Sequence, residues 1–312
     1  MNEPLVSVII PVKNASRTIG KCLESLMDLD YPSFEVIVVD DYSEDETVQV
    51  IRGFGNHVRL IAETAATGPS RARNAAARIA QGQFLAFTDG DCVVDRQWLR
   101  QLIKGFETDR VAAVGGAQAV PSDENAFGRK VAFFLQRAGV VTEYVRRPSK
   151  KLRFVRHNAS CNAVYRKDIF LALGGFLPGL WPGEDVELDH RLIRKGYRIL
   201  SNPQAVVYHY RPNDMRQFLR MMWRYGWAQG ILVRRSGLFR ILHVLPFFAL
   251  AALILWFIPS TLILAVSLSI IAASGLLILS GLRADISWLF MTGFLSWNAG
   301  FWQGFIKNNL RG

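Results

Sequence analysis

The chain has 312 residues, of which 50% are hydrophobic, and a formal net charge of +11; this length holds one large domain, or a domain with an appendage. The charge alone would allow nucleic-acid binding, but a cluster of arginines from Arg211 to Arg240 lies directly before the first long apolar run. Because such residues mark the cytoplasmic side of a membrane and attract anionic head groups, we predict membrane lipids, and no nucleic acid, as partners.

Short apolar runs alternate with helical patterns from residue 5 to about residue 116. The sequence predicts strands over 5–12, 34–39, 58–62, 84–88 and 112–116, and helices over 16–29, 45–53, 69–81 and 98–106. This alternation predicts an α/β fold with a mostly parallel sheet and helices on both faces. In such sheets, ligands bind outside the C-terminal ends of the strands.

The pattern is less regular from residue 126 onward. We expect helices over 126–144, 168–173 and 184–195, strands over 161–165 and 205–208, and a basic loop over 146–156. Residues 214–235 predict an amphipathic pair of helices, with arginines four residues apart on one face. Such helices can lie in the membrane interface.

Two C-terminal segments contain no Asp, Glu, Lys or Arg, over 244–282 and 286–306. The first is long enough for two membrane spans, since one span needs roughly 20 apolar residues. The second contains three tryptophans, which suit an interface, but its length and its glycines at 293, 300 and 304 would also allow a third span packed against the other two. We therefore expect two or three spans and favour two.

The expected organisation is a globular catalytic domain over 1–210, basic interface helices over 211–241 and a membrane region over 242–312. No signal peptide is evident at the N-terminus, where the apolar stretch is short and β-branched. The three cysteines show neither a disulfide framework nor the ligand spacing of a structural zinc site. These features predict that the large domain lies in the reducing cytoplasm.

A pair of aspartates follows the fourth predicted strand, in the sequence Asp89-Gly90-Asp91. Two carboxylates on a tight turn, which the glycine would permit, can hold Mg²⁺ or Mn²⁺. Such an ion bridges a diphosphate and stabilises charge on a leaving group. The same residues could instead form a polar turn before the helix that begins at Trp98.

Two further polar clusters lie near strand ends. Asp40 and Asp41 follow the second strand, where a carboxylate can accept hydrogen bonds from a nucleoside, although acids before a helix explain the pair equally. Arg71 and Arg73 lie on the helix that follows Gly68-Pro69, where their guanidinium groups could meet phosphates or belong to a solvated helix face.

The acids Glu184 and Asp185 begin a predicted helix. Carboxylates favour a helix N-terminus for dipole reasons alone, whereas the functional interpretation is a catalytic base that deprotonates an acceptor hydroxyl. His209 follows the last predicted strand, and a lone histidine at a strand end is more often structural than a ligand.

Six motifs in this order resemble those of the family 2 glycosyltransferases, which have the GT-A fold. The motifs are SVIIPVKN at 7–14, VVDDYSED at 38–45, GPSRARNAA at 68–76, FTDGDC at 87–92, LGGF at 173–176 and GEDVELDHRL at 183–192. The resemblance covers about residues 5–210. It implies a metal-dependent, inverting transfer of a sugar from a nucleotide-sugar donor, with UDP-sugars favoured over GDP-sugars.

The resemblance also implies roles for individual residues. Asp185 would be the general base with Glu184 beside it, and Asp91 would be the direct metal ligand. The donor would be bound by Pro11, Asn14, Asp40, Asp41, Arg71, Arg73, Asn74, Asp89, Gly90 and Arg220. The metal, Mg²⁺ or Mn²⁺, would be held by Asp89, Asp91 and His209. The acceptor would contact Asn162, Ala163 and Trp181.

One motif of this family is incomplete. Processive polysaccharide synthases of the family carry QxxRW, whereas here Gln217 and Arg220 are followed by Met221. This departure disfavours a processive synthase, which would also need more spans. A nucleotidyltransferase could share the alternating sheet and the metal, and a catalytically silent membrane scaffold could share the apolar segments. The basic, membrane-facing stretch favours a lipid-linked or polyprenyl-phosphate acceptor.

Overall fold

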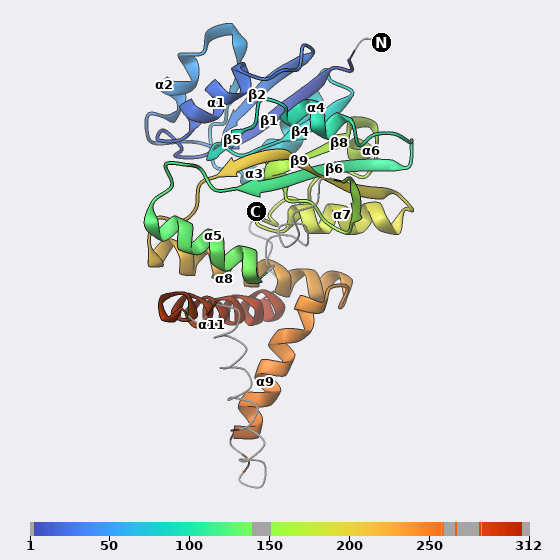
Figure 1. The fold of residues 1–312 in the computed structure, drawn as a ribbon. Coiled ribbons are helices and arrows are strands. Elements are labelled where there is room, and N and C mark those ends of the chain that lie inside the picture. Colours follow the sequence, from blue (N-terminus) through green and yellow to red (C-terminus); the bar gives the residue numbers. More distant parts are fainter. Residues whose placement is uncertain are drawn as a thin grey trace. The chain divides into compact units, whose positions relative to one another are not determined.

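The computed structural model describes residues 3–138, 151–256 and 283–307, together with the single positions 258, 266 and 281. The described chain forms two compact units (Figure 1). The first contains residues 3–124 and 151–210, and the second contains Asn125–Ala138 and the described residues from Arg211 onward. The three-part organisation expected from the sequence stays a prediction.

The first unit is built on one mixed sheet. Its strands are β1 (Val6–Val12), β2 (Phe34–Asp40), β3 (Arg59–Ala62), β4 (Phe84–Phe87), β5 (Cys92–Val94), β6 (Val111–Ala119), β7 (Arg153–Val155), β8 (Ala163–Arg166) and β9 (Arg198–His209). They run in the order β3-β2-β1-β4-β8-β6-β9-β5, and β7 also pairs with β9. The β3-β2-β1-β4 part is parallel, as is the pair of β6 with β9, whereas β8, β5 and β7 pair antiparallel with their neighbours.

The fold is therefore α/β in class, as predicted, but its sheet is mixed, because β8, β5 and β7 add antiparallel pairs to the parallel ones that the sequence predicts. β8 is antiparallel to β4 because of the place where β8 begins. Ala163, its first residue, pairs with Phe87, the last residue of β4, so β8 runs back along β4. This entry point brings the short helix η2 (Ser160–Asn162) to the edge of the sheet where β4 ends and the Asp89-Gly90-Asp91 turn begins.

Helices cover both faces of the sheet, which confirms that part of the prediction. They are α1 (Ile19–Met27), α2 (Thr47–Arg52), η1 (Gly55–His57), α3 (Pro69–Ile79), α4 (Trp98–Ile103), α6 (Lys167–Ala172) and α7 (Glu184–Arg194). A hydrophobic core lies on each face of the sheet. Successive residues of a strand point to opposite faces, so alternate side chains of β1 pack in different cores. Val8 and Ile10 pack in the core with α1 and α4, whereas Ile9 packs in the core with α3 and α7.

Several expected elements differ from the observed ones. The last strand, β9, covers twelve residues rather than the predicted 205–208, and β5 and β7 were not predicted. Both missed strands are three residues long, too short to show a period, and both are strands because they pair with β9. β7 lies in the stretch 146–156 that was expected to be a loop; residues 146–150 lie outside the described residues.

The second unit contains α5 (Ala126–Ala138), α8 (Met215–Ser236), η3 (Ile241–Val244), α9 (Leu245–Trp256) and α11 (Ala284–Lys307). The expected pair of helices over 214–235 is one continuous helix, α8. Asp214 caps its N-terminus by accepting a hydrogen bond from the backbone of Gln217, and its two internal glycines face α11. Packing on a neighbouring helix thus compensates for the low helix propensity of glycine.

Helices α8 and α11 approach each other at glycines. A Cβ atom added at Gly226 would lie 1.8 Å from the carbonyl oxygen of Trp297, and one added at Gly300 would lie 2.0 Å from that of Trp223. From the sequence, the glycines of α11 would also allow a third span packed against the spans of 242–282. In the structure, Gly300 and Gly304 pack against α8 instead, because α8 offers glycines at the matching spacing.

No single helix within the described residues is both long and apolar enough to span a membrane. The pair formed by Met215–Ser236 and Ile241–Trp256, bent by 96°, meets the length and composition of a span when taken together. Most of the apolar run over 244–282 lies outside the described residues beyond α9. The choice between two and three spans therefore stays a prediction.

Candidate active site

The Asp89-Gly90-Asp91 turn joins β4 to β5 and lies beside the end of β9. Because β5 pairs antiparallel with β9, His209 comes next to this turn, and its Nε2 lies 3.3 Å from Oδ1 of Asp91. One ligand atom each of Asp89, Asp91 and His209 lies within 4.8 Å of the other two. Two carboxylates and one imidazole are a donor set that can hold Mg²⁺ or Mn²⁺.

The sequence suggests that Gly90 permits the backbone angles of the turn, whereas in the structure the position needs a glycine because of close packing. Its φ angle lies outside the left-handed region, so the turn itself does not need a glycine. A Cβ atom at this position would instead lie 2.7 Å from Cγ1 of Val12. The absence of a side chain therefore lets the turn pack closely against the end of β1.

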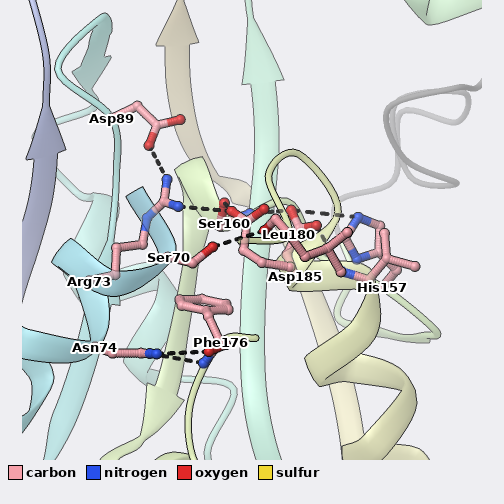
Figure 2. Close-up of polar contacts among 11 residues, drawn as sticks. Ser70, Arg73, Asn74, Asp89, His157, Ser160, Phe176, Leu180 and Asp185 are labelled. Atoms are coloured by element: carbon pink, nitrogen blue, oxygen red, sulfur yellow. Dashed lines mark hydrogen bonds and ion pairs between the residues drawn. The ribbon is translucent and has the colours of Figure 1, made fainter. Parts of the chain in front are cut away.

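Arg73 lies buried between two acids that come from different parts of the chain. Its Nη2 donates to Oδ1 of Asp89 at 2.5 Å (Figure 2), and its Nη1 donates to Oε1 of Glu184 at 2.8 Å. Burial alone would lower the pKa of Arg73, but the two carboxylates raise it, so the guanidinium stays charged. From the sequence, Arg73 could meet a phosphate or lie on a solvated helix face; in the structure it is buried and joins the turn after β4 to the start of α7, and its contact with a donor stays a prediction.

Glu184 is the first residue of α7 and is buried. Its Oε1 also accepts a hydrogen bond from Oγ of Ser160 at 3.2 Å. Burial and then the charge of Asp185 raise the pKa of Glu184 to about 8, against the lowering effect of Arg73. Glu184 therefore binds a proton much more readily than an ordinary glutamate.

Asp185 is held in a fixed orientation and keeps some exposure. Its Oδ2 accepts a hydrogen bond from the backbone N–H of Ser160 at 2.9 Å, and its Oδ1 accepts one from the N–H of Val186 at 2.8 Å. Its side chain is 14% exposed, which leaves it accessible to a substrate hydroxyl. These are the properties that a general base needs: a defined position and access to the proton it removes.

His157 lies beside Asp185 (Figure 2), and its other ring nitrogen contacts a second, fully buried aspartate. Its Nε2 is 4.0 Å from Oδ2 of Asp185, and its Nδ1 is 3.0 Å from Oδ2 of Asp189. Asp189 also accepts hydrogen bonds from the hydroxyl of Tyr165 and the backbone N–H of Asn158. Burial raises the pKa of Asp189, and the bonds from His157 and Asn158 oppose that shift.

Sequence reasoning missed His157, Ser160 and Asp189. Asp189 could have been found from the sequence, because it lies four residues after Asp185 on a predicted helix and therefore on the same helix face. Ser160 and His157 carried none, since they come from an irregular stretch. Their place beside Asp185 follows from the way η2 reaches the sheet edge.

The residues predicted to bind the nucleoside make hydrogen bonds that connect the loops after β1, β2 and β3. Asp41 accepts hydrogen bonds from the backbone N–H groups of Thr67 and Gly68, and Asp40 accepts one from that of Ser43. Oδ1 of Asp40 is buried and has no hydrogen-bond partner among the described residues. Their role toward a donor stays a prediction, as do those of Pro11, buried in β1, and Asn14, which accepts from the N–H of Glu44.

Asn74 ties α3 to the segment before α7. Its amide donates to the carbonyl of Phe176 at 2.7 Å and accepts from the N–H of Phe176 at 2.9 Å. Gly175 makes this possible, since its φ is +71° and an added Cβ atom would lie 2.4 Å from Oδ1 of Asn74. On the same helix Arg71 is exposed. Donor contacts by Asn74 and Arg71 stay predictions.

The residues expected at the acceptor differ in exposure. Asn162 is fully buried and cross-links the chain, since its Oδ1 accepts from Nε1 of Trp98 and its Nδ2 donates to two backbone carbonyls. Ala163 is buried at the start of β8, whereas Trp181 is 42% exposed. Arg220 is exposed on α8 in the second unit. Their contacts with substrates stay predictions.

One protein-family profile covers more than half of the chain. The profile described as Glycosyl transferase family 2 matches residues 7–174. The chain belongs to this family. It is therefore a glycosyltransferase, which confirms the enzyme class expected from the six motifs.

Two archaeal relatives cover most of this glycosyltransferase. It is 30% identical over 236 residues to the glycosyltransferase AglE of Haloferax volcanii, a match that covers 72% of this chain and 73% of the relative. It is 25% identical over 254 residues, 78% of each chain, to a Methanococcus voltae enzyme named as a dolichyl N-acetyl-alpha-D-glucosaminyl phosphate 3-beta-D-2,3-diacetamido-2,3-dideoxy-beta-D-glucuronosyltransferase.

Solved structures confirm a GT-A-like fold. The mannosyltransferase PcManGT from Pyrobaculum calidifontis, solved with GDP-Man and Mn²⁺, superposes with a TM-score of 0.66 over 98% of this chain and 88% of that chain, at 20% identity. GalNAc-T7, solved with UDP, GalNAc and Mn²⁺, superposes with a TM-score of 0.54 over 76% of this chain and 52% of that chain, at 18% identity. At such identities the likeness concerns the fold.

Proposed function

We propose that this glycosyltransferase moves a sugar, with inversion, from a nucleotide-sugar to a lipid-linked acceptor, and that the reaction depends on Mn²⁺ or Mg²⁺. The observation that carries the proposal is the position of Arg73. By pairing with both Asp89 and Glu184, it holds the carboxylates that fit a metal and the acids at the start of α7 in one site. A diphosphate and an acceptor hydroxyl must lie this close for a direct displacement.

In the proposed reaction Asp185 removes the proton of the acceptor hydroxyl as its oxygen attacks the anomeric carbon. A bond forms between that oxygen and the carbon, and the bond from the carbon to the diphosphate oxygen breaks on the opposite side, which inverts the configuration. The backbone N–H groups of Ser160 and Val186 keep the carboxylate of Asp185 oriented for this step. A metal held by Asp89, Asp91 and His209 would supply positive charge for the leaving diphosphate.

The names of relatives support a lipid-linked acceptor. The Methanococcus voltae enzyme is named for a dolichyl-phosphate substrate. An Escherichia coli relative, 30% identical over 133 residues and 42% of this chain, is named as a glucosyltransferase acting on a diphosphoundecaprenol-linked sugar. The donor is proposed to be a UDP-sugar before a GDP-sugar. Met221, in place of the Trp of QxxRW, favours the addition of a single sugar over processive synthesis.

A membrane location is also proposed, with the catalytic unit in the cytoplasm and membrane lipids as partners. The observation that supports this location is the exposed apolar surface of α9 in the second unit. This helix contains no charged residue, and most of its large apolar side chains are exposed, among them Phe248, Leu253 and Trp256. A patch of this kind is rarely left facing water. The basic end of α8, with Arg234 and Arg235, suits anionic head groups.

The test is a screen of nucleotide-sugars with polyprenyl-phosphate and polyprenyl-diphosphate sugars in detergent, with Mn²⁺ or with EDTA. We expect transfer of one sugar with one donor, and its loss in EDTA. Asp91→Asn should reduce transfer at least about 100-fold, because it removes an anionic ligand without changing the size of the side chain. Undiminished transfer in EDTA would refute the metal dependence, and long products would favour a processive synthase.

A second variant separates the base from the donor site. Asp185→Asn should abolish turnover but leave the affinity for the donor nucleotide unchanged, as measured by calorimetry, because the carboxylate acts on the acceptor hydroxyl. A parallel loss of donor affinity would place Asp185 in the donor site instead.

A further inference from the structure

Two buried cysteines lie beside the candidate metal centre and take no part in the proposed reaction. Cys92 begins β5, directly after Asp91, and Cys161 lies in η2. Cys92 is opposite His209 in the β5–β9 ladder, so the two side chains share a face of the sheet. The Sγ atoms of both cysteines and one ring nitrogen of His209 lie within 4.8 Å of one another. These three residues are the thiol cluster.

The thiol cluster has the donor set of a thiophilic cation. Two thiolates and one imidazole match the Cys₂His sets that hold Zn²⁺ with an open fourth position. The sulfur and nitrogen atoms that bind a tetrahedral zinc ion lie about 3.5 to 3.8 Å from one another. Side-chain movements of about 1 Å would therefore bring the three ligand atoms, now within 4.8 Å of one another, to these separations. Binding requires both sulfurs as thiolates, so the thiol proton that Cys92 now donates toward Oδ1 of Asp91 at 3.9 Å would be released.

Burial suits such an ion. Cys92 is 0% exposed and Cys161 is 5% exposed, so a lone thiolate charge on Cys92 would be costly there. A divalent ion with two thiolates and a neutral imidazole has no net charge and avoids that cost. Access is available at one side, because the side chain of His209 is 17% exposed and that of Asp91 is 47% exposed.

His209 belongs to both possible ligand sets. It is within reach of the two thiols and, through the same ring, of the carboxylates of Asp89 and Asp91. Soft thiolates select Zn²⁺, whereas carboxylates select Mg²⁺ and Mn²⁺. A ring nitrogen of His209 can bind only one ion at a time, so the two sites compete for this imidazole.

We propose that Cys92, Cys161 and His209 form a second metal site, specific for thiophilic divalent cations such as Zn²⁺, and that its occupation withdraws His209 from Asp89 and Asp91 and weakens the binding of Mn²⁺. The site is thus an inhibitory one, built next to the reaction centre from residues that the transfer itself does not use, apart from the shared histidine. The inhibitory role rests on the proposed metal-dependent transfer.

Cadmium is the probe for the first experiment, because its thiolate complexes absorb in the ultraviolet. The full chain, reduced and freed of metal, is titrated with Cd²⁺, and a thiolate-to-cadmium band is expected that saturates at one ion per chain. Cys92→Ala and Cys161→Ala should each abolish the band, and His209→Ala should weaken Cd²⁺ binding at least about 10-fold. Cys22→Ala is the matched control, since Cys22 is also buried but lies outside the thiol cluster, and it should keep the band.

A measurement on the unaltered chain covers the case in which a cysteine variant fails to fold. X-ray absorption of the chain loaded with one equivalent of Zn²⁺ should give two sulfur neighbours and at least one nitrogen neighbour. A shell of oxygen and nitrogen alone, or a cadmium band lost in Cys22→Ala but kept in Cys92→Ala and Cys161→Ala, would overturn the proposal.

The coupling to the reaction centre is measured with Mn²⁺, whose binding is followed by its electron paramagnetic resonance signal. Zn²⁺ should raise the apparent Kd for Mn²⁺ about 10-fold in the unaltered chain and have no such effect in Cys161→Ala. An unchanged Kd overturns the inhibitory role. Asp91→Asn should lose Mn²⁺-dependent transfer yet keep the cadmium band, so failure of the proposed reaction and failure of the thiophilic site are distinguishable.

Discussion

Arg73 is the residue on which the geometry of the site depends most. Its side chain is 1% exposed, and its two carboxylate partners come from the turn after β4 and from the start of α7. Removing one member of a buried ion pair leaves its partner uncompensated: here Asp89 would keep an uncompensated charge, and Glu184, whose raised pKa favours the protonated form, would lose its hydrogen-bond donor. The neighbouring Arg71, on the same helix, is exposed and offers a matched comparison.

Arg73→Met should therefore destabilise the chain by about 3–5 kcal/mol, whereas Arg71→Met should change stability by no more than about 0.5 kcal/mol. Thermal unfolding followed by circular dichroism in EDTA measures both. Equal effects of the two substitutions would show that the Arg73 pairs contribute little to folding.

Glu184 makes the stability of the chain depend on pH. Its pKa rises from 4.5 to about 8 on folding, so between these values the folded chain holds a proton that the unfolded chain has released. Stability should then fall as the pH rises from about 4.5 to about 8. Glu184→Gln cannot titrate and should lack this part of the dependence. Denaturation profiles of the two proteins in EDTA, compared at several pH values, measure the difference; parallel profiles would contradict the raised pKa.

His157 is expected to act through Asp185 rather than on a substrate. Its contact with Asp189 fixes the ring, and its Nε2 faces Asp185. His157→Ala should lower kcat about 10-fold or more and leave the KM for the donor unchanged, since the base would lose its neighbour. His157→Asn keeps a donor for Asp189 and should restore part of the rate. A change in KM alone would assign His157 to donor binding.

At the scale of elements, the close approach of α8 and α11 organises the second unit. Gly226 and Gly230 of α8 face backbone atoms of α11, and Gly300 and Gly304 of α11 face backbone atoms of α8. Gly226 and Gly230 of α8, like Gly300 and Gly304 of α11, are four residues apart and thus let the two helices meet backbone to backbone.

Gly300→Ala should therefore destabilise the second unit, because its Cβ atom would lie 2.0 Å from the carbonyl oxygen of Trp223. We expect a loss near the upper end of the roughly 1–3 kcal/mol typical of overpacking. Gly20→Ala is the control, since on α1 the nearest atom to an added Cβ is 3.6 Å away. Hydrogen exchange of α8 and α11 reports the loss locally, and equal protection in both variants would contradict it.

At the scale of the whole molecule, the chain combines a unit that contains the candidate active site with a helical unit that exposes apolar surface on α9. All three native cysteines are buried, so a single introduced cysteine can be labelled with little background. Basic residues near Ser236 and none near Ser260 predict which side of a membrane each position faces.

A membrane-impermeant maleimide should label Ser260→Cys in intact cells and Ser236→Cys only after lysis. The reason is that arginines before the first apolar run keep that end in the cytoplasm. Labelling of Ser236→Cys in intact cells would reverse the orientation, and recovery of the unlabelled chain in the soluble fraction would contradict the membrane location.

The sequence by itself determined the α/β class, the helices on both faces of the sheet and the family, because hydrophobic periods and the order of six motifs are local properties of the chain. It also pointed to Asp89, Asp91, Glu184 and Asp185. It failed on β5 and β7, which are too short to carry a period, and on the direction of β8, which depends on where the chain re-enters the sheet.

Only the tertiary structure decided the partners of those acids. The pairing of Arg73 with Asp89 and Glu184, the place of His157 between two aspartates, and the meeting of Cys92, Cys161 and His209 all join residues far apart in the sequence. No spacing rule predicts such contacts, because they arise where β4, η2, α7 and β9 reach one edge of the sheet. Their energies depend on burial, which the fold as a whole creates.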